Sequence, residues 1–275
     1  MPELPETETI ARDLQREVRG RTIESVFVRK DDVLREVTAR TLADRAVAAT
    51  IVRSWRRAKL IVLDLSSGDR LVVQPRFTGA LLVWRGPLPE REATYSTLHF
   101  GLDDGRDLHY RDIRRLGTVA LMPPARFTEY SAGLGIEPLD PAFTGAHLSV
   151  LLRGSRQAVK KVLMDQRRIV GIGNIYASEA CWRAGVDPSR AAGRVSDQEV
   201  SALRDGIISV LTESIAARGT SFRDYRDASG GRGDFERSLT VYGRGGEACL
   251  RCGARLVETH AIDGRTTVLC AHCQR

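Results

Sequence analysis

Four cysteines near the carboxyl end of the sequence have the spacing of a metal site. Cys249 and Cys252 form one Cys-x2-Cys pair, Cys270 and Cys273 form another, and 17 residues separate the pairs. Four thiolates complete a tetrahedral zinc site that can fold a hairpin too short to have its own core. Because protein sulfur would fill every position, the pattern predicts one structural zinc ion. Four free or disulfide-bonded cysteines are the alternative, which suits a cytosolic chain poorly.

The amino end offers a second kind of chemistry. The chain opens MPELPETETI, and the small residue at position two usually lets the initiator be removed, which would leave Pro2 with a free secondary amine beside Glu3 and Glu6. The same residues suit a helix entry, because the first turn tolerates proline and acidic side chains there complement the helix dipole. The stretch alone leaves both interpretations open, a nucleophile or a helix entry.

The composition is that of an ordinary globular chain with a basic balance. Its 275 residues are 42% hydrophobic and 28% charged, and this length suggests about two domains. The sequence has no run of about 18 apolar residues to span a membrane and no amino-terminal targeting pattern, so we expect a cytoplasmic protein. The net charge of +7 points to a polyanionic partner.

The first half of the chain has the pattern of one helix followed by many short strands. Ile10, Leu14 and Val18 recur at helical spacing and predict a helix over 5–18. The segments rich in β-branched and aromatic residues are 22–29, 48–55, 59–65, 69–84, 96–102 and 106–112. Little helix is expected between them, so the pattern predicts an antiparallel β-sandwich. The proline- and glycine-rich stretch that follows predicts a linker over 124–145.

Helical periodicity returns between residues 146 and 218. Ser196 and Glu199 form a capping box at the start of one expected helix. The turn Gly171-Ile-Gly-Asn174 precedes another, where backbone N–H groups suit a phosphate, although a plain packing corner explains the turn equally well. Neighbouring basic residues favour contact with a nucleic-acid backbone. These residues are Lys160, Lys161, Arg167 and Arg168.

Between the two cysteine pairs, the sequence predicts two short strands joined by an Asp-Gly turn. Arg265 follows that turn at the tip of the hairpin. An arginine on a rigid zinc-held hairpin is placed to clamp a phosphate, and a solvated surface arginine is the alternative. Cys181 lies apart from the other cysteines and is expected to be a buried free thiol.

In combination, these motifs resemble the formamidopyrimidine-DNA glycosylase family. MPELPE, RRAK, DIRRLG, DQRRIVGIGNIYASEA, GTSFRDY with VYGR, and the cysteine pairs occur in the family's order across essentially the whole chain. The resemblance implies an α+β protein with an N-terminal helix on an antiparallel β-sandwich, a C-terminal helical domain with a helix-two-turn-helix motif, and a zinc finger. We place these parts at 1–123 for the sandwich, 124–145 for the linker, 146–237 for the helical DNA-binding domain, and 238–275 for the finger.

The resemblance also implies a chemical role for the amino end. It indicates a monomeric, bifunctional DNA glycosylase and AP lyase of base-excision repair that acts on double-stranded DNA carrying oxidised bases or abasic sites. Pro2 would attack C1′ of the damaged nucleotide and form an iminium ion, which serves as an electron sink for β- and δ-elimination. Glu3 would be the general acid and base, and Glu6 would bind the N-terminal segment or the ribose.

The resemblance to the family implies DNA contacts at four further positions. Lys59, Asn174 and Arg265 match the residues that bind phosphates beside the lesion. Arg114 matches the arginine that faces the base left without a partner.

Three positions depart from the usual family pattern. Gln74 stands where histidine is usual, Phe77 where methionine is common, and Leu116 where a phenylalanine wedge is common. Phe77 and Leu116 have either exchanged the aromatic and aliphatic wedge roles or become core residues. These departures bear on opposite-base preference and on the search for lesions.

The loop over 219–237, hereafter the lid loop, bears on the substrate. It resembles the lid that closes over everted 8-oxoguanine, with Arg223 in a basic position of that lid. Together with MPELPE, the lid loop favours oxidised purines over the oxidised pyrimidines preferred by the sister enzyme, endonuclease VIII. The alternatives are that pyrimidine specificity and a non-catalytic zinc-finger DNA-binding protein. Removal of Met1 is required for the amine chemistry, because a retained methionine would place the Pro2 nitrogen in a peptide bond.

Overall fold

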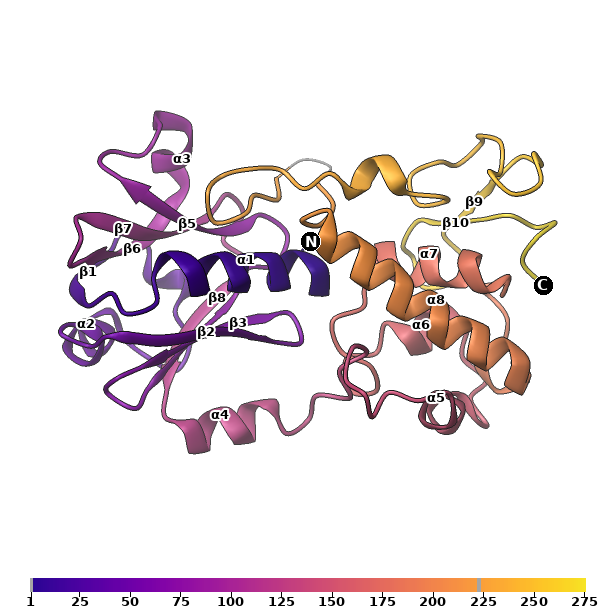
Figure 1. The fold of residues 1–275 in the computed structure, drawn as a ribbon, viewed down its shortest axis with the longest axis horizontal. Helices are drawn as coiled ribbons and strands as arrows, with labels where there is room; N and C mark the ends of the chain where they lie inside the picture. The colour runs from indigo at the N-terminus through magenta and orange to yellow at the C-terminus, as the bar shows by residue number, and fades with distance from the viewer. Residues whose placement is uncertain (1, 222–223) are drawn as a thin grey trace. The chain divides into compact units, whose positions relative to one another are not determined.

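The computed structural model describes residues 2–221 and 224–275, so Met1 and Arg223 lie outside the described residues. The chain divides into two compact units (Figure 1). The first, the sandwich unit, comprises Met1–Gly133 and Ala217–Glu236, and the second, the helical unit, comprises Leu134–Ala216 and Arg237–Arg275. None of the described helices is both apolar and extended enough to cross a lipid bilayer.

Two four-stranded antiparallel sheets form the sandwich unit, which confirms the predicted sandwich. Their strand orders are β1-β6-β7-β5 and β2-β3-β4-β8. The strands are β1 (Ile23–Val28), β2 (Ile51–Arg57), β3 (Leu60–Leu65), β4 (Arg70–Gln74), β5 (Gly79–Arg85), β6 (Ser96–Leu102), β7 (Arg106–Asp112) and β8 (Thr118–Met122). The single run expected over 69–84 is two strands, because Pro75 has no N–H for a ladder and its carbonyl instead accepts from Gly79 N at 2.8 Å.

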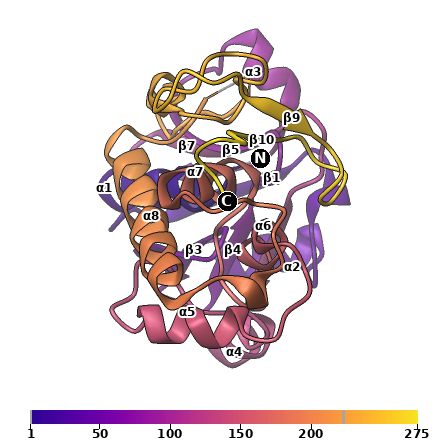
Figure 2. The ribbon, with the colours of Figure 1, turned by 90° about the vertical axis from the view of Figure 1, so that its right-hand side faces the viewer.

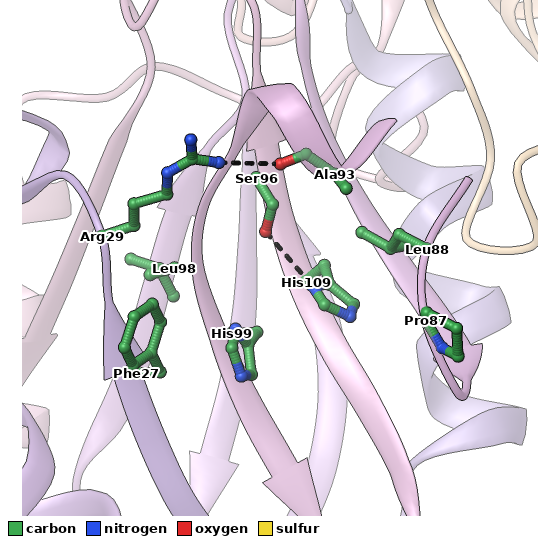
Figure 3. Close-up of a pocket in the computed structure, with 9 residues that line it drawn as sticks. All are labelled: Phe27, Arg29, Pro87, Leu88, Ala93, Ser96, Leu98, His99 and His109. Atoms are coloured by element: carbon green, nitrogen blue, oxygen red, sulfur yellow. Dashed lines mark hydrogen bonds between the residues drawn. The ribbon is translucent and has the colours of Figure 1, made fainter. Parts of the chain in front are cut away.

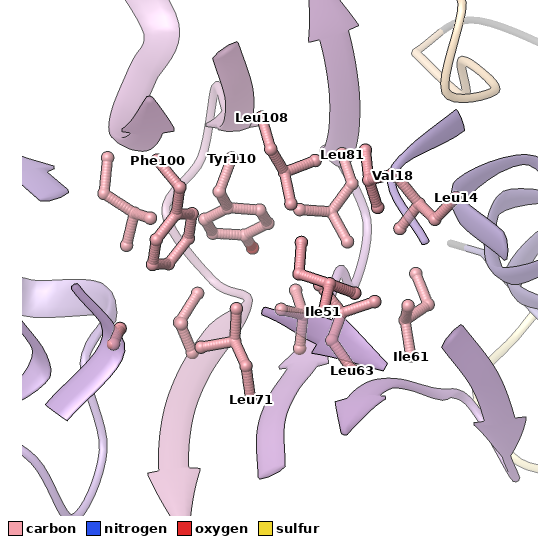
Figure 4. Close-up of a cluster of buried hydrophobic side chains, with 14 of the residues drawn as sticks. Leu14, Val18, Ile51, Ile61, Leu63, Leu71, Leu81, Phe100, Leu108 and Tyr110 are labelled. Carbon is pink, nitrogen blue, oxygen red and sulfur yellow. The ribbon is translucent and has the colours of Figure 1, made fainter. Parts of the chain in front are cut away.

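Helix α1 (Leu4–Glu17) is fixed by the apolar core of this unit. Leu14 and the following Val18 are fully buried in one cluster with Ile61 of β3 and Leu81 of β5 (Figure 4). Burying one such side chain contributes about 1.5–3 kcal/mol, so several of them hold the helix firmly. The core thereby fixes the position of the residues at the amino end of α1.

Short helices occur where the sequence analysis expected none. They are η1 (Asp31–Val33), α2 (Ala39–Ala46), α3 (Glu90–Tyr95) and α4 (Pro124–Ser131). Helices of two turns or fewer leave little room for a periodic pattern, which is why they were not predicted. Helix α4 occupies the start of the predicted linker: proline favours its first turn, and Phe127 is buried beneath the Arg70 guanidinium, 5.1 Å from the ring centroid.

The helical unit and the passage to its finger contain the remaining elements. They are α5 (Gly145–Leu152), α6 (Val159–Leu163), α7 (Asn174–Ala184), η2 (Ala192–Arg194), α8 (Asp197–Ala216), η3 (Phe235–Ser238), β9 (Val257–Thr259) and β10 (Thr267–Leu269). Helices α7 and α8 lie side by side (Figures 1 and 2). The predicted capping box is confirmed, since Ser196 N donates to Glu199 Oε2 at 2.8 Å. Cys181 of α7 is buried, and burial raises the pKa of its thiol to about 12.

The described part of the lid loop clusters with the sandwich unit, whereas the sequence analysis grouped it with the helical domain. Arg218, just before it, pairs with Asp13 of α1 at 2.6 Å and with Asp227 at 2.5 Å. Burial alone would raise the pKa of Asp227, but Arg218 and the Ser229 hydroxyl lower it. Pairing across about 200 residues of sequence leaves no local pattern, so this attachment is visible only in the structure.

Candidate active site and nucleic-acid interface

Two buried carboxylates close the amino end of α1. Glu3 is the N-cap and forms a capping box with Glu6, whose Oε2 accepts from Glu3 N at 2.8 Å. Glu3 is 3% exposed and Glu6 is 1% exposed, and Pro2 beside them is buried as well. The helix-entry interpretation is therefore confirmed. It is compatible with the chemical one, because the cap holds Glu3 and the adjoining Pro2 in a defined place.

Glu6 also holds the start of the lid loop. Its second oxygen, Oε1, accepts from Thr220 N at 2.8 Å, and Tyr225 Oη donates to the Glu6 backbone carbonyl at 3.4 Å. Burial first, and the Glu6 charge second, raise the pKa of Tyr225 well above its usual value, so this hydroxyl stays a donor. Gly219 has a φ of +86°, and a Cβ there would lie 3.0 Å from Glu6 Cγ. Glu6 was predicted to bind the N-terminal segment or the ribose, and its bond from Glu3 N is a contact with the N-terminal segment.

Lys59 lies in the turn between β2 and β3 and is only 8% exposed. Its neighbour Ala58 has a φ of 54°, and the Ala58 carbonyl accepts from Arg56 Nη1 at 3.0 Å. The same guanidinium donates from Nε to Glu8 Oε2 of α1 at 2.8 Å. Although burial would raise the pKa of Glu8, Arg56 lowers it, so the pair is ionic. Arg56 therefore ties the turn that carries Lys59 to the helix that carries Glu3.

The expected wedge residues lie on two exposed loops of the sandwich unit. Phe77 is 47% exposed and Leu116 is 41% exposed, so the alternative that they are core residues is wrong. The Arg114 guanidinium lies over the Phe77 ring, 5.2 Å from its centroid. Gln74 Oε1 accepts from Arg76 Nε at 3.3 Å. The structure therefore brings Arg114 and Phe77 together and leaves the apolar surface of Phe77 and Leu116 exposed.

A buried carboxylate that the sequence analysis did not single out joins these two loops. Asp112 is 1% exposed; its Oδ1 accepts from Thr78 Oγ1 at 2.5 Å and Arg114 N at 3.2 Å, and its Oδ2 accepts from Gly117 N at 2.8 Å and Tyr110 Oη at 3.1 Å. A Cβ at Gly117 would lie 1.9 Å from the Tyr110 hydroxyl, so only glycine fits there. The signal was the acid at the start of DIRRLG, which ends the strand RDLHYRD just before the basic pair.

In the helical unit, Asn174 begins α7 and reaches the finger. Asn174 Nδ2 donates to the Thr266 carbonyl at 3.0 Å, and Thr266 is the residue next to Arg265. Its Oδ1 is buried without a hydrogen-bond partner among the described residues. The Arg265 side chain is 59% exposed. Asn174 and the hairpin that carries Arg265, two of the predicted phosphate contacts, are thus linked by a hydrogen bond.

Lys160 has a different role from the one its neighbourhood suggested. It is fully buried, and its Nζ donates to Thr267 Oγ1 at 2.6 Å and to the Thr266 carbonyl at 3.3 Å. A lysine enclosed in this way cannot reach a DNA backbone, so its expected contact with nucleic acid is wrong. Lys161 and Arg167 are exposed and keep that possibility. The adjacent lysines look alike in the sequence, and only the packing of α6 separates them.

The four paired cysteines fit a single zinc ion. Their sulfur atoms lie within 4.8 Å of one another, and Cys252 Sγ is 3.5 Å from Cys270 Sγ. Sulfurs bound to zinc at about 2.3 Å in a tetrahedron are about 3.8 Å apart. Burial opposes ionisation of Cys249, but backbone N–H groups from Arg251 and Cys252 and the Trp182 N–H lower its pKa to about 6. The site takes a structural zinc ion, as predicted.

Glu179 of α7 is a second buried carboxylate that the sequence analysis did not single out. It accepts from the backbone N–H groups of Thr240, Val241 and Tyr242 at 2.8–3.1 Å and is fully buried. These bonds attach the VYGR segment, at the start of the finger, to the same helix that begins with Asn174. The signal was a glutamate among the small and apolar residues of NIYASEA.

A β-sandwich with a capped, buried amino end and with Phe77 and Leu116 exposed, a helical unit and a four-cysteine finger together have the architecture of a DNA-binding repair enzyme. Three family comparisons agree with this class. Residues 1–119 match the formamidopyrimidine-DNA glycosylase N-terminal domain, residues 134–226 match the formamidopyrimidine-DNA glycosylase H2TH domain, and residues 246–275 match a zinc finger found in FPG and IleRS.

Full-length relatives give the same result. The chain is 42% identical over 276 residues to the formamidopyrimidine-DNA glycosylase of Xanthomonas campestris pv. campestris strain B100, covering 100% of both chains. It is also similar to two structures of Lactococcus lactis Fpg, each 29% identical with a TM-score of 0.92. One is bound to DNA containing N7-benzyl-Fapy-dG and the other to DNA containing an abasic site, with 100% and 99% of both chains covered. The chain belongs to the formamidopyrimidine-DNA glycosylase family.

Proposed function

We propose that the chain, a formamidopyrimidine-DNA glycosylase, removes formamidopyrimidines and 8-oxoguanine from double-stranded DNA and then cleaves the strand as an AP lyase. The observation that carries the proposal is the arrangement of Pro2 directly ahead of the buried Glu3 and Glu6 capping box. After removal of Met1, a secondary amine would lie beside a carboxylate at the end of a helix that is packed into the core. The DNA substrate implies that the enzyme works in the compartment that holds the DNA, and we expect a monomer.

In the proposed reaction, the Pro2 nitrogen attacks C1′ of the damaged nucleotide and the glycosidic bond breaks, so the base leaves with a proton. The C1′–O4′ bond then opens, O4′ takes a proton, and the nitrogen lone pair forms an iminium with C1′. Loss of a C2′ proton expels the 3′ phosphate, and a second elimination expels the 5′ phosphate. Glu3 moves the protons on the opening sugar, and water finally releases Pro2.

The remaining predicted residues would hold the DNA during these steps. Lys59, Asn174 and Arg265 would contact phosphates beside the lesion. Arg114, Phe77 and Leu116 would occupy the space left when the damaged base leaves the stack. The exposure of Phe77 and Leu116 supports this role. The lid loop with Arg223 would close over the everted purine.

Borohydride trapping tests the nucleophile. Intact mass first establishes that Met1 is absent, and the protein is then reduced on duplexes carrying 8-oxoguanine opposite cytosine. We expect a covalent adduct from the wild type and from Pro5→Ala, a proline substitution within the helix, and none from Pro2→Gly. A correctly processed wild type that binds the duplex without forming an adduct would contradict the proposal and support the non-catalytic DNA-binding alternative.

A second measurement tests the substrate class. Excision of 8-oxoguanine opposite cytosine is compared with excision of thymine glycol under single-turnover conditions. We expect the purine lesion to be removed at least about tenfold faster, a difference of roughly 1.4 kcal/mol in the barrier. Faster removal of thymine glycol would assign the endonuclease VIII-like specificity instead.

A further inference from the structure

The outer face of the β1-β6-β7-β5 sheet carries a hollow that the proposed reaction does not use. Its volume is about 290 Å³, near the lower end of the range for small-molecule pockets. Phe27, His99 and His109 line it on the sheet side, and Leu88 and Ala93 line it from the segment that includes α3 (Figure 3). All of these residues belong to the sandwich unit.

Three rings from neighbouring strands form a ladder along this hollow. Phe27 of β1 lies directly opposite His99 of β6, and His99 lies directly opposite His109 of β7. The Phe27 and His99 centroids are 5.2 Å apart with planes at 32°, and the two imidazoles are 5.0 Å apart at 38°. Because the sheet ladder fixes this register, the rings present a preformed surface on which a flat molecule can stack.

His109 supplies one polar group that has no partner. Its side chain is buried, with the residue 7% exposed, and Nδ1 is 3.1 Å from Ser96 Oγ. Nε2 has no hydrogen-bond partner in the part of the chain that the structure describes, since the nearest carboxylate oxygen, on Asp107, is 3.9 Å away. Burial, with help from His99, lowers the pKa of His109 to about 4. The imidazole is therefore neutral near pH 7, and Nε2 is a single donor or acceptor. Because Nε2 is covered in this structure, a ligand reaches it when a side chain that lines the hollow moves aside.

The surroundings restrict what this group can bind. A metal ion is disfavoured, because the one cluster of three or more close metal-ligating side chains found in residues 2–221 and 224–275 is the four-cysteine site. A strongly anionic ligand is disfavoured because Arg29, the one cation among the lining residues, donates to the Ala93 carbonyl at 3.1 Å. An aliphatic ligand would leave Nε2 without a hydrogen bond.

We propose that the hollow binds a planar, uncharged nitrogen heterocycle of the size of a single nucleobase. Its ring stacks beside Phe27 and His99, its edge exchanges one hydrogen bond with His109 Nε2, and Leu88 covers its apolar side. Aromatic side chains stack on any nucleobase, because every base has a π face. Purines and pyrimidines therefore both belong to the proposed ligand class. The site is independent of Pro2 and of the wedge loops.

Ligand-observed NMR with adenine as the probe tests this site on the full-length, zinc-loaded protein. A ten-atom ligand is expected to bind with a Kd of about 1 mM or tighter. His109→Phe keeps a ring and removes Nε2, and should weaken adenine binding at least tenfold. Ala93→Leu fills the hollow and should abolish binding. His147→Phe, a matched substitution on α5, should leave it unchanged.

Controls separate this proposal from weaker explanations. Circular dichroism and incision of lesion DNA should be unchanged in all three variants, so lost binding is not lost folding. Toluene binding as well as adenine would overturn the heterocycle class, and adenine binding that survives in both His109→Phe and Ala93→Leu would overturn the location. Displacement of adenine by abasic-site DNA would assign the binding to the lesion site instead, and absence of binding to the wild type would refute the proposal.

Discussion

The sandwich unit and the zinc finger position their functional residues by different physical means. Glu3 and Lys59 are positioned by α1 and by a turn tied to it, and α1 itself is packed into an extended apolar core. The finger has a small buried cluster in which two members, Cys249 and Cys270, are metal ligands. Packing thus holds the amino end that carries Glu3, whereas the hairpin that carries Arg265 depends on a metal ion and on a few buried polar bonds.

Removing the metal should have the largest effect, and this effect should be confined to the finger. Cys270→Ser, or chelation of zinc, is expected to unfold the finger, because structural zinc contributes about 10–16 kcal/mol in zinc-finger peptides. Arg265 would lose its fixed place, and affinity for lesion DNA should fall at least tenfold. Trp182, which packs against the finger core under the Arg251 guanidinium, reports the change by fluorescence. An intact Trp182 signal with full DNA affinity would show that packing alone holds the finger.

A cavity in the apolar core should have the next largest effect, a loss of stability that is confined to the sandwich unit. Leu14→Ala is expected to lower the free energy of unfolding of the sandwich unit by about 2–5 kcal/mol. Denaturant titration followed at Trp84 measures it, while the Trp182 signal should be unaffected. Arg12→Ala is the control on the same helix: its exposed ion pair with Glu8 is worth at most about 1 kcal/mol. Equal losses in the free energy of unfolding from Leu14→Ala and Arg12→Ala would contradict the conclusion that the apolar core holds α1.

Acid should weaken the sandwich unit through His109. Its pKa is about 4 in the folded chain and about 6.5 when unfolded, so protonation favours the unfolded state. The contribution of neutral His109 to the free energy of unfolding is complete above pH 6.5. It is lost as the pH falls toward 4, which lowers the free energy of unfolding by up to about 3 kcal/mol. Thermal unfolding of wild type and His109→Phe between pH 7 and pH 4 measures the difference. Parallel curves for the two proteins would exclude His109 as the source.

Weakening the polar contact of Glu179 should have the smallest effect, located at the start of the finger. Glu179→Gln retains the shape but replaces one acceptor oxygen with a donor that faces N–H groups. We expect a loss of about 1–3 kcal/mol in stability of the helical unit. Amide exchange of Thr240, Val241 and Tyr242 should accelerate while exchange in β6 and β7 stays unchanged. Unaltered exchange at 240–242 would show that the finger does not rely on this bond.

Much of this organisation could be predicted from local sequence patterns. Segments rich in β-branched and aromatic residues identified most of the sandwich strands, and the paired cysteines identified the zinc ligands, because each signal lies within a short stretch of sequence. The capping box at Ser196 and the turn before α7 were likewise visible, since each needs only four or five consecutive residues.

The parts that escaped prediction depend on contacts between distant residues. Asp112 joins two loops, Arg218 pairs with Asp13 across 205 residues, and Lys160 turns inward while its neighbour Lys161 stays exposed. A buried charged residue cannot be recognised from its neighbours in the sequence. The free-energy cost of its burial is offset by partners that only folding brings together. The interior polar bonds that position the functional loops were therefore the least predictable features.

The two oxygens of Glu6 have a consequence for inhibitor design. One accepts from Glu3 N and the other from Thr220 N, so the amino end and the root of the lid loop share a single carboxylate. A compound that displaced the Thr220 N–H would remove one of the bonds that hold the start of the lid loop beside α1. Such a molecule would act on the support of Glu3 and the lid loop, and not at the residues proposed to bind phosphates.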